Sequence, residues 1–294
     1  MSGAHEDGSA SVRPAGVLVT WSPDEPAAEG EAMALARRLA LKCAKPPVGD
    51  TRRSSRTETS AADLWLIVRN GGLTLAESPS GRGASLRIDF LRGAMRSRLR
   101  RAPAERQLLA RAVGWKGPGL TVLDATAGVG SDAFLLAWLG CQVTAVERSA
   151  VLGALLEDGV RRAAREGDDR YREAVDRLDL ITADAVSVLN GLADGKRPEV
   201  VYVDPMYPDS GRSAKSRKAM ELSRRVVGDD ADAGEVFRVA RQVARRRVVV
   251  KRRARAAPLA EGATMCLAGR TIRYDVYVVH EEAMGLKRDG GNEG

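Results

Sequence analysis

The chain has 294 residues, of which 44% are hydrophobic, and 47 basic against 39 acidic residues give it a net charge of +8. This length suggests one large domain or a main domain with a smaller appendage, and no apolar run approaches the roughly 20 residues of a membrane span. The basic excess favours a polyanionic partner if the cations are clustered, but an arginine-rich soluble protein explains it equally well.

Histidine and cysteine are too sparse for several kinds of chemistry. The two histidines, His5 and His280, lie near the chain ends, which argues against Ser-His-Asp, Cys-His and His-metal sites. The cysteines Cys43, Cys141 and Cys266 form no CxxC pair, so neither a disulfide framework nor a zinc site is expected. The N-terminal stretch carries acids and lacks the apolar segment of a secretory signal. We therefore expect a cytoplasmic protein with no metal and no membrane partner.

The N-terminal part predicts a disordered polar tail over residues 1–15 and a small α+β region over 16–91. Asn70-Gly71-Gly72 between two apolar runs is a hairpin signal. The expected elements, in chain order, are a strand at 16–21, a helix at 29–43, two hairpin strands within 61–77 and a strand at 84–90.

Strands and helices alternate over residues 92–282, and this pattern predicts the main domain there. A flexible tail is expected over 283–294. A basic helix is expected first, over 92–115. The expected strands are TVLDAT (121–126), QVTAVE (142–147), RLDLITAD (177–184), EVVYVDPMY (199–207), RRVVVKR (246–252) and TIRYDVYVV (271–279). The helices between them are SDAFLLAWLG (131–140), SAVLGALLEDGVRRAARE (149–166), AVSVLNGL (185–192) and AGEVFRVARQVA (233–244). This alternation predicts an α/β, Rossmann-like fold, with a mostly parallel sheet and helices on both faces.

A glycine turn follows the first strand of the main domain. Gly128 and Gly130 lie between a strand and a helix, where glycine lets the backbone approach a ligand closely. The next strand ends in Glu147, an acid placed to accept hydrogen bonds from the ribose hydroxyls of an adenosine. S-adenosylmethionine and a dinucleotide both contain that group.

The acids around the glycine turn favour S-adenosylmethionine. Asp124 ends the first strand and Asp132 follows the glycines. Carboxylates repel a pyrophosphate but attract the cationic sulfonium and amino group of the methyl donor. The small Ala133 in place of a third glycine leaves a permissive dinucleotide match open. Asp184 ends the third strand, where an adenine contact and a helix N-cap explain it equally well.

The fourth strand ends in Asp204-Pro205-Met206-Tyr207. The exocyclic amine of a nucleobase is a poor nucleophile because its lone pair is delocalised into the ring. The Asp204 carboxylate and a carbonyl held by Pro205 would accept its N–H groups and stabilise the developing positive charge. Tyr207 offers a face on which an unpaired base stacks. Asp-Pro also initiates ordinary turns, but downstream of the glycine loop and its acids we favour catalysis by Asp204, Pro205 and Tyr207.

A cluster of cations follows this motif. Arg212, Lys215, Arg217 and Lys218 are expected near the pocket mouth, where they would hold phosphates beside a flipped nucleotide. A solvated helix face is the alternative explanation for each of them. Lys251, in RRVVVKR, is a further candidate for RNA contact.

The blocks VLDATAGVGSDAFLLAWLGCQVTAVERS, LLEDGV, VVYVDPMYP, RSAKSRKAM and RRVVVKR resemble, in order and spacing, the RsmJ family of bacterial small-subunit rRNA guanine-N2 methyltransferases. The resemblance covers roughly residues 84–279. It implies a class I methyltransferase with a seven-stranded sheet, S-adenosylmethionine as cofactor, 16S rRNA or the small ribosomal subunit as partner, and transfer to the 2-amino group of one guanine.

The resemblance also assigns residues. It places donor binding on Ser131-Asp132, Glu147-Arg148, Asp184-Ala185 and Asp204. The family typically has Arg-Asp at the first pair and Ser-Ser at the third, and DPMF with a following His where this chain has DPMY and Asp209. The candidate donor-binding residues are thus Asp124, Gly128, Gly130, Ser131, Asp132, Glu147, Arg148, Asp184, Ala185 and Asp204.

Three alternatives remain open on the sequence. The same chemistry on another base amine, such as adenine N6, has the same requirements. A dinucleotide-dependent oxidoreductase would use the glycine loop but lacks an obvious proton donor. A basic RNA-binding ribosome assembly factor would keep the fold without catalysis.

Overall fold

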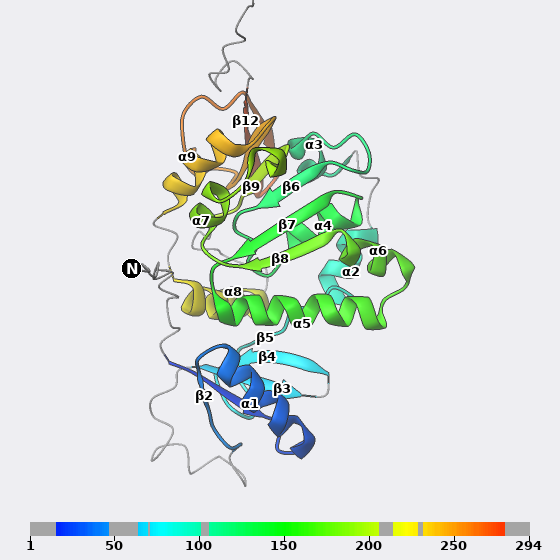
Figure 1. Cartoon of the computed structure of the whole chain (residues 1–294), viewed down its shortest axis with the longest axis vertical. Coiled ribbons are helices and arrows are strands. Elements are labelled where there is room, and N and C mark those ends of the chain that lie inside the picture. Colours follow the sequence, from blue (N-terminus) through cyan, green and yellow to red (C-terminus); the bar gives the residue numbers. More distant parts are fainter. Residues whose placement is uncertain are drawn as a thin grey trace, which may run out of the picture. The chain divides into compact units, whose positions relative to one another are not determined.

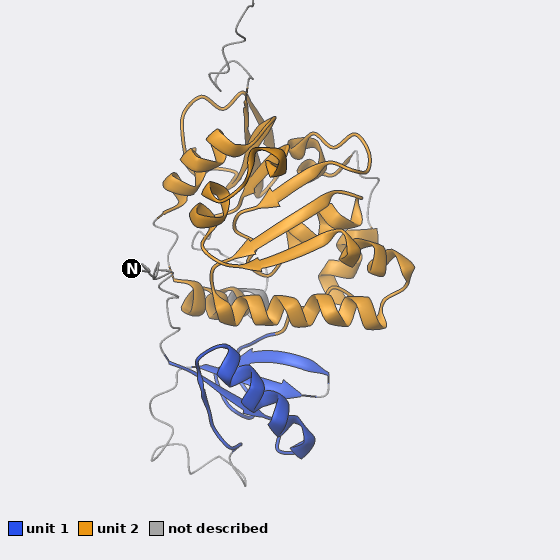
Figure 2. Ribbon diagram, in the orientation of Figure 1, with its two compact units in different colours: residues 1–86 blue, residues 87–294 orange. Residues whose placement is uncertain are grey.

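The computed structural model describes residues 16–46, 64–69, 71–100, 106–205, 214–228 and 232–279, with the backbone alone for 214–217. The chain divides into two compact units, residues 1–86 and 87–294 (Figure 2). Residues 87–91, which the sequence placed with the N-terminal region, belong to the second unit. There Phe90 stacks on Phe134 with ring centroids 4.1 Å apart, and the guanidinium of Arg162 donates a hydrogen bond to the carbonyl of Ile88.

Unit 1 contains a five-stranded sheet in the order β2-β1-β3-β4-β5. The predicted hairpin is confirmed, since Arg69 pairs antiparallel with Gly72. The predicted helix ends earlier than expected because Ala40 takes a left-handed φ of 52°, and the chain then pairs with β1 as a short strand. The elements are β1 (Val17–Trp21), η1 (Pro26–Ala28), α1 (Glu29–Arg38), β2 (Lys42–Cys43), β3 (Leu64–Arg69), β4 (Gly72–Ala76) and a β5 (Ser85–Leu86) shorter than predicted.

Unit 2 is built on a seven-stranded sheet in the order β11-β12-β10-β9-β6-β7-β8 (Figure 1). Its strands are β6 (Thr121–Asp124), β7 (Gln142–Glu147), β8 (Leu178–Thr182), β9 (Val200–Val203), β10 (Arg247–Arg253), β11 (Met265–Ala268) and β12 (Ile272–Val278). The five strands from β8 to β10 are mutually parallel, and β12 pairs antiparallel with both β10 and β11. The predicted Rossmann-like, mostly parallel sheet is therefore confirmed.

Helices cover both faces of this sheet. Helices α7 (Ala185–Asn190) and α9 (Ala233–Val243) pack on one face over a core that includes Leu123, Val203 and Val250. Helix α3 (Leu108–Val113) contacts β10 and β12, while α4 (Ser131–Trp138) contacts β7 and β8. The remaining helices are α2 (Gly93–Arg100), α5 (Ala150–Glu166), α6 (Asp169–Asp176), η3 (Asp194–Lys196) and α8 (Ala214–Val227). In the described ranges no helix is long and apolar enough to span a membrane.

The structure departs from the predicted elements of this unit in four places. The helix predicted over 92–115 is two helices, α2 and α3, and α3 ends at Gly114 with a left-handed φ of 71°. Helix α6, which Asp168 caps by accepting from the backbone N–H of Tyr171, was not predicted. Nor were α8 and the edge strand β11, because a highly charged helix and an exposed four-residue strand carry little apolar periodicity.

Chain order explains where a ligand binds. From β6 the chain proceeds through β7 to β8 on one side, and then returns to place β9 on the other side of β6. This reversal leaves a crevice at the carboxyl ends of β6 and β9, the usual ligand position in open α/β sheets.

Candidate active site

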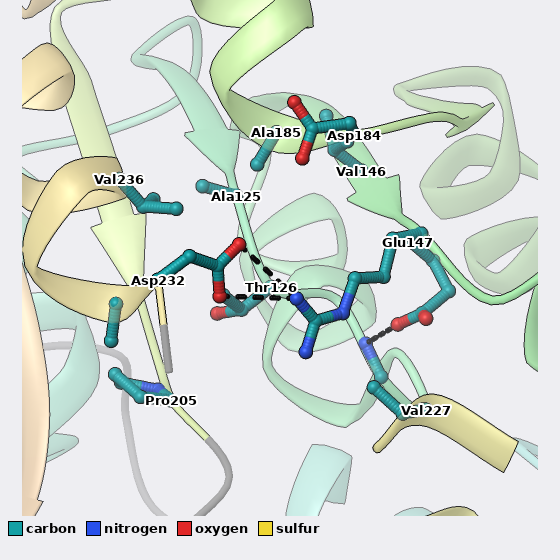
Figure 3. Close-up of a pocket in the computed structure, with 13 residues that line it drawn as sticks. Ala125, Thr126, Val146, Glu147, Asp184, Ala185, Pro205, Val227, Asp232 and Val236 are labelled. Atoms are coloured by element: carbon teal, nitrogen blue, oxygen red, sulfur yellow. Dashed lines mark hydrogen bonds and ion pairs between the residues drawn. The ribbon is translucent and has the colours of Figure 1, made fainter. Parts of the chain in front are cut away.

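A pocket of about 500 Å³, including its open mouth, lies at this crevice (Figure 3). Its walls come from the ends of β6, β7, β8 and β9 and from the start of α9. The lining residues are Ala125, Thr126, Gly128, Val146, Glu147, Arg148, Asp184, Ala185, Pro205, Val227, Asp232, Ala233 and Val236.

The two glycines of the predicted loop have different roles. Both are left-handed, with φ of 56° at Gly128 and 71° at Gly130. A Cβ added at Gly128 would meet nothing closer than a carbonyl oxygen of Thr126 at 3.9 Å, and Gly128 lines the pocket. A Cβ at Gly130 would lie 2.4 Å from Cδ1 of Leu156, inside the protein. Gly128 therefore keeps the pocket open, whereas Gly130 allows helix α5 to pack against the loop.

Glu147 fixes the glycine loop from the end of β7. Its Oε2 accepts a hydrogen bond from the backbone N–H of Gly128 at 2.9 Å, and its Oε1 accepts from the N–H of Ser149 at 2.8 Å. Glu147 is buried and lines the pocket. Its contact with a ribose stays a prediction.

The structure is compatible with both roles expected of Asp184, helix capping and a ligand contact. Its Oδ1 accepts from the N–H of Ser187 at 2.8 Å and so caps helix α7. The same residue lines the pocket together with Ala185. An adenine-contacting role is therefore compatible with capping.

Arg148 reaches across the pocket to Asp232 at the N-cap of α9. Its Nη1 lies 3.0 Å from Oδ1 and 3.1 Å from Oδ2 of Asp232 (Figure 3). Sequence reasoning missed Asp232, although an acid directly before a predicted helix is a capping signal. The ion pair joins β7 to α9 over the pocket.

We expect Asp232→Asn to weaken S-adenosylmethionine binding by about two- to fivefold, because the pair that orients Arg148 is about one-third exposed and so contributes modestly. Titration calorimetry with the donor measures this. Glu235→Gln is the matched control, since Glu235 pairs with Arg238 on the exposed surface of the same helix. An unchanged affinity of Asp232→Asn for the donor would show that the ion pair takes no part in donor binding.

Asp204 and Pro205 follow β9 at the same edge. The backbone N–H of Asp204 donates to Oγ1 of Thr126 at 2.6 Å, which ties the end of β9 to the loop after β6. Pro205 lines the pocket. Sequence reasoning missed Thr126, whose hydroxyl fixes the backbone at the predicted catalytic acid.

Beneath this edge lies an ionic cluster around Asp132, which is nearly fully buried. Its Oδ1 accepts from Nη2 of Arg98 at 2.5 Å, and its Oδ2 accepts from Oη of Tyr202 at 2.6 Å and Nζ of Lys251 at 2.8 Å. The same ammonium lies 2.7 Å from Oδ2 of Asp204. Burial alone would raise the pKa of Asp132, but the two cations hold that pKa well below its usual range.

Asp124 has the opposite electrostatics. It is buried at the end of β6, and its Oδ1 accepts from the N–H of Thr126 at 3.1 Å. Burial raises the pKa of Asp124 well above its usual range, and the charges of Asp132 and Asp204 act in the same direction. Asp124 is therefore the acid of this edge that favours its neutral form.

The predicted site residues thus fall into four groups. Gly128, Glu147, Arg148, Asp184, Ala185 and Pro205 line the pocket. Asp124, Gly130, Ser131, Asp132 and Asp204 surround it without being part of that lining, and Lys251 contacts two of these acids. Lys218 is exposed on α8, which also carries Lys215 and Arg217. Tyr207, Arg212 and the side chains of Lys215 and Arg217 lie outside the described residues.

Comparison with known proteins decides the family. The family model for SAM-dependent methyltransferases matches residues 51–279. A ribosomal RNA small subunit methyltransferase J from Thioalkalivibrio sulfidiphilus is 44% identical over 223 residues, which are 75% of this chain and 87% of that protein. The protein of the same name from Chromobacterium violaceum is 40% identical over 257 residues, 83% of this chain and 98% of that one. This chain belongs to the methyltransferase J family.

A solved member of the wider methyltransferase group supports the assignment. The crystal structure of a SAM-dependent methyltransferase from Neisseria gonorrhoeae aligns over 92% of this chain and 99% of the other chain. The two are 29% identical in sequence, and the TM-score is 0.64. The methyltransferase J assignment makes S-adenosylmethionine the cofactor and removes the dinucleotide alternative.

The pocket of this methyltransferase J member fits that cofactor. The open space at Gly128 admits a ligand against the backbone, and Glu147 and Asp184 supply carboxylates for its hydroxyl and amino groups. Ala125, Val146 and Val236 add an apolar wall for its adenine. The residues that would hold the donor are therefore Gly128, Glu147, Arg148, Asp184 and Ala185.

Proposed function

We propose that this protein transfers a methyl group from S-adenosylmethionine to the exocyclic N2 amine of a guanine in small-subunit (16S) ribosomal RNA, in the cytoplasm. The observation that carries this proposal is the position of Asp204-Pro205. Pro205 lines the donor pocket, and the preceding carboxylate lies at the same sheet edge, next to it in the chain. Acceptor groups for an amine thus lie beside the pocket that would hold the methyl donor.

The reaction needs little covalent chemistry from the protein's own side chains. S-adenosylmethionine supplies an electrophilic methyl group whose bonding electrons leave with the sulfur. Asp204 would accept a hydrogen bond from the amine N–H and stabilise the positive charge that develops on nitrogen as the new C–N bond forms. The nitrogen then loses one proton to solvent. The backbone carbonyl of Pro205 is a second acceptor, and the rest of the acceleration comes from positioning.

RNA contacts are proposed for the basic segment after this motif. Lys218 is exposed, and α8 carries Lys215 and Arg217 besides it. Cations in such a row neutralise phosphates with little sequence preference. Tyr207 would stack on the target base and Arg212 would contact the backbone beside it. Guanine as the base rests on the resemblance of the sequence blocks, and the ribosomal substrate on the names of the relatives.

The test is methyl transfer from labelled S-adenosylmethionine into small ribosomal subunits, and into naked 16S rRNA, from cells that lack this enzyme, followed by nucleoside analysis. We expect label in N2-methylguanosine. Label in N6-methyladenosine would replace guanine by adenine and keep the mechanism. RNA binding without any transfer would favour an assembly factor and refute the catalytic proposal.

A further inference from the structure

Lys251 lies between two acids at the active edge of the sheet. Its ammonium is 2.7 Å from Oδ2 of Asp204 and 2.8 Å from Oδ2 of Asp132, and its side chain is 23% exposed. These contacts place its charge among carboxylates rather than at the protein surface. The residue therefore has a defined partner in the catalytic motif.

The sheet register explains this arrangement. Val250 of β10 pairs in parallel with Val203 of β9, so the next residues along the two strands are Lys251 and Asp204. Paired residues of parallel strands point their side chains to the same face. The ammonium and the carboxylate consequently meet at the strand ends.

Asp132 holds Lys251 from the other side. This acid is itself fixed by Arg98 of α2 and by the hydroxyl of Tyr202, at 2.5 and 2.6 Å. Burial alone would lower the pKa of Lys251, but Asp132 and Asp204 hold that pKa well above its usual range, so the lysine stays charged. The lysine is thus a fixed cation with two anionic anchors.

We propose that Lys251 is a positioning residue for methyl transfer: it orients the Asp204 carboxylate and keeps it ionised, so that this carboxylate accepts the N–H of the target amine. The inference rests on the proposed function, because it assigns that role to Asp204.

The charges around Lys251 make its contribution large. The groups that face it are Asp204 after β9, Tyr202 on β9, Asp132 on α4 with its partner Arg98 on α2, Tyr274 on β12 and Asp124 on β6. Three carboxyl groups thus share this edge with two cations, and Asp124 favours the neutral form. Without the lysine only Arg98 would remain, and carboxylates that share a site favour protonation of one another.

Lys251→Met tests the proposal in the full-length protein. We expect kcat to fall about 100-fold, as for a misplaced catalytic group, with KM for S-adenosylmethionine nearly unchanged because Lys251 does not line the pocket. The acid limb of kcat/KM should move to higher pH, since the loss of the neighbouring cation disfavours the ionised Asp204. Lys251→Arg retains the charge and should keep the wild-type acid limb with an intermediate kcat.

Two further variants separate positioning from folding. Lys196→Met, an exposed lysine in η3, is the matched control and should behave as wild type. If Lys251→Met does not fold, Asp132→Asn serves in its place: Lys251 then keeps its charge but loses one anchor, so kcat should fall about tenfold without an upward move of the acid limb. A folded Lys251→Met or Asp132→Asn enzyme with wild-type kcat would overturn the proposal.

A substrate-free measurement keeps this inference separate from the proposed function. In protein labelled with ¹³C-aspartate, the Asp204 carboxyl carbon, identified by its loss in Asp204→Asn, should titrate at higher pH in Lys251→Met than in wild type. An unchanged titration would refute the role of Lys251 whatever the substrate. A wild-type enzyme that leaves rRNA unmethylated would instead refute the proposed function.

Discussion

The Asp204→Ala variant is expected to transfer methyl groups about 1,000-fold more slowly than wild type, the loss typical of removing a group that stabilises transition-state charge. Binding of S-adenosylmethionine should stay within about threefold, because the donor pocket is lined by other residues. A lower kcat with retained donor affinity would identify an interaction made only in the transition state. Single-turnover transfer and donor titration measure the two quantities.

The physical reason lies in the charge that develops on the amine. The nitrogen becomes positive as the C–N bond forms, and a carboxylate held in a fixed position beside it stabilises that charge. The alanine side chain accepts no hydrogen bond. Lys251 would still have Asp132 as a partner at 2.8 Å, so we expect the variant to fold.

A control acid on the same sheet separates this role from general electrostatics. Asp179 is exposed on the edge strand β8, and Asp179→Ala removes the same charge away from the pocket. It should leave kcat unchanged. Equal activity of Asp204→Ala and Asp179→Ala would show that the carboxylate after β9 takes no part in the chemistry.

The sequence predicted this edge because parallel strands bring their carboxyl ends together. Glu147, Asp184 and Asp204 each follow an apolar run, so strand periodicity placed them at the same edge of the sheet. The partners of Lys251 could not be predicted from strand periodicity. They depend on the register between β9 and β10 and on the packing of α4, and neither is set by local sequence.

Two other ion-pair partners could not be predicted from the sequence for a similar reason. Asp232 meets Arg148 across 84 positions of the chain, and Arg98 meets Asp132 across 34. A charged residue is compatible with a solvated surface and with a buried pair, and only tertiary packing distinguishes the two. The sequence therefore placed the acids at this edge of the sheet more readily than the ionic cluster beneath it.

The two loop glycines illustrate the same limit, since nothing in Gly128-Val129-Gly130 distinguishes their roles. Gly130→Ala is expected to destabilise unit 2 by about 3 kcal/mol. A left-handed alanine costs roughly 1–2 kcal/mol, and overpacking against a buried side chain adds about 1–3 kcal/mol. The added Cβ would lie 2.4 Å from Cδ1 of Leu156 and 3.4 Å from the ring of Phe90, so neighbouring groups must move.

Gly128→Ala is the matched comparison, because it has the same backbone strain without the clash. It should cost only about 1 kcal/mol and should weaken donor binding, since its methyl group would enter the pocket. Hydrogen exchange in β6 and β7 reports the free energy of opening in the relevant unit. Equal exchange in the two variants would contradict the packing role of Gly130.

Leu156→Ala combined with Gly130→Ala tests the same contact directly. Each change alone removes stability, the first by about 2–5 kcal/mol through a cavity. The double variant should lose about 1–2 kcal/mol less stability than the two single variants lose in total. The reason is that the alanine methyl group at 130 occupies space that the leucine vacates. Additive costs would mean that backbone strain alone requires a glycine there. A favourable coupling would show that the second glycine of the loop serves the packing of α5.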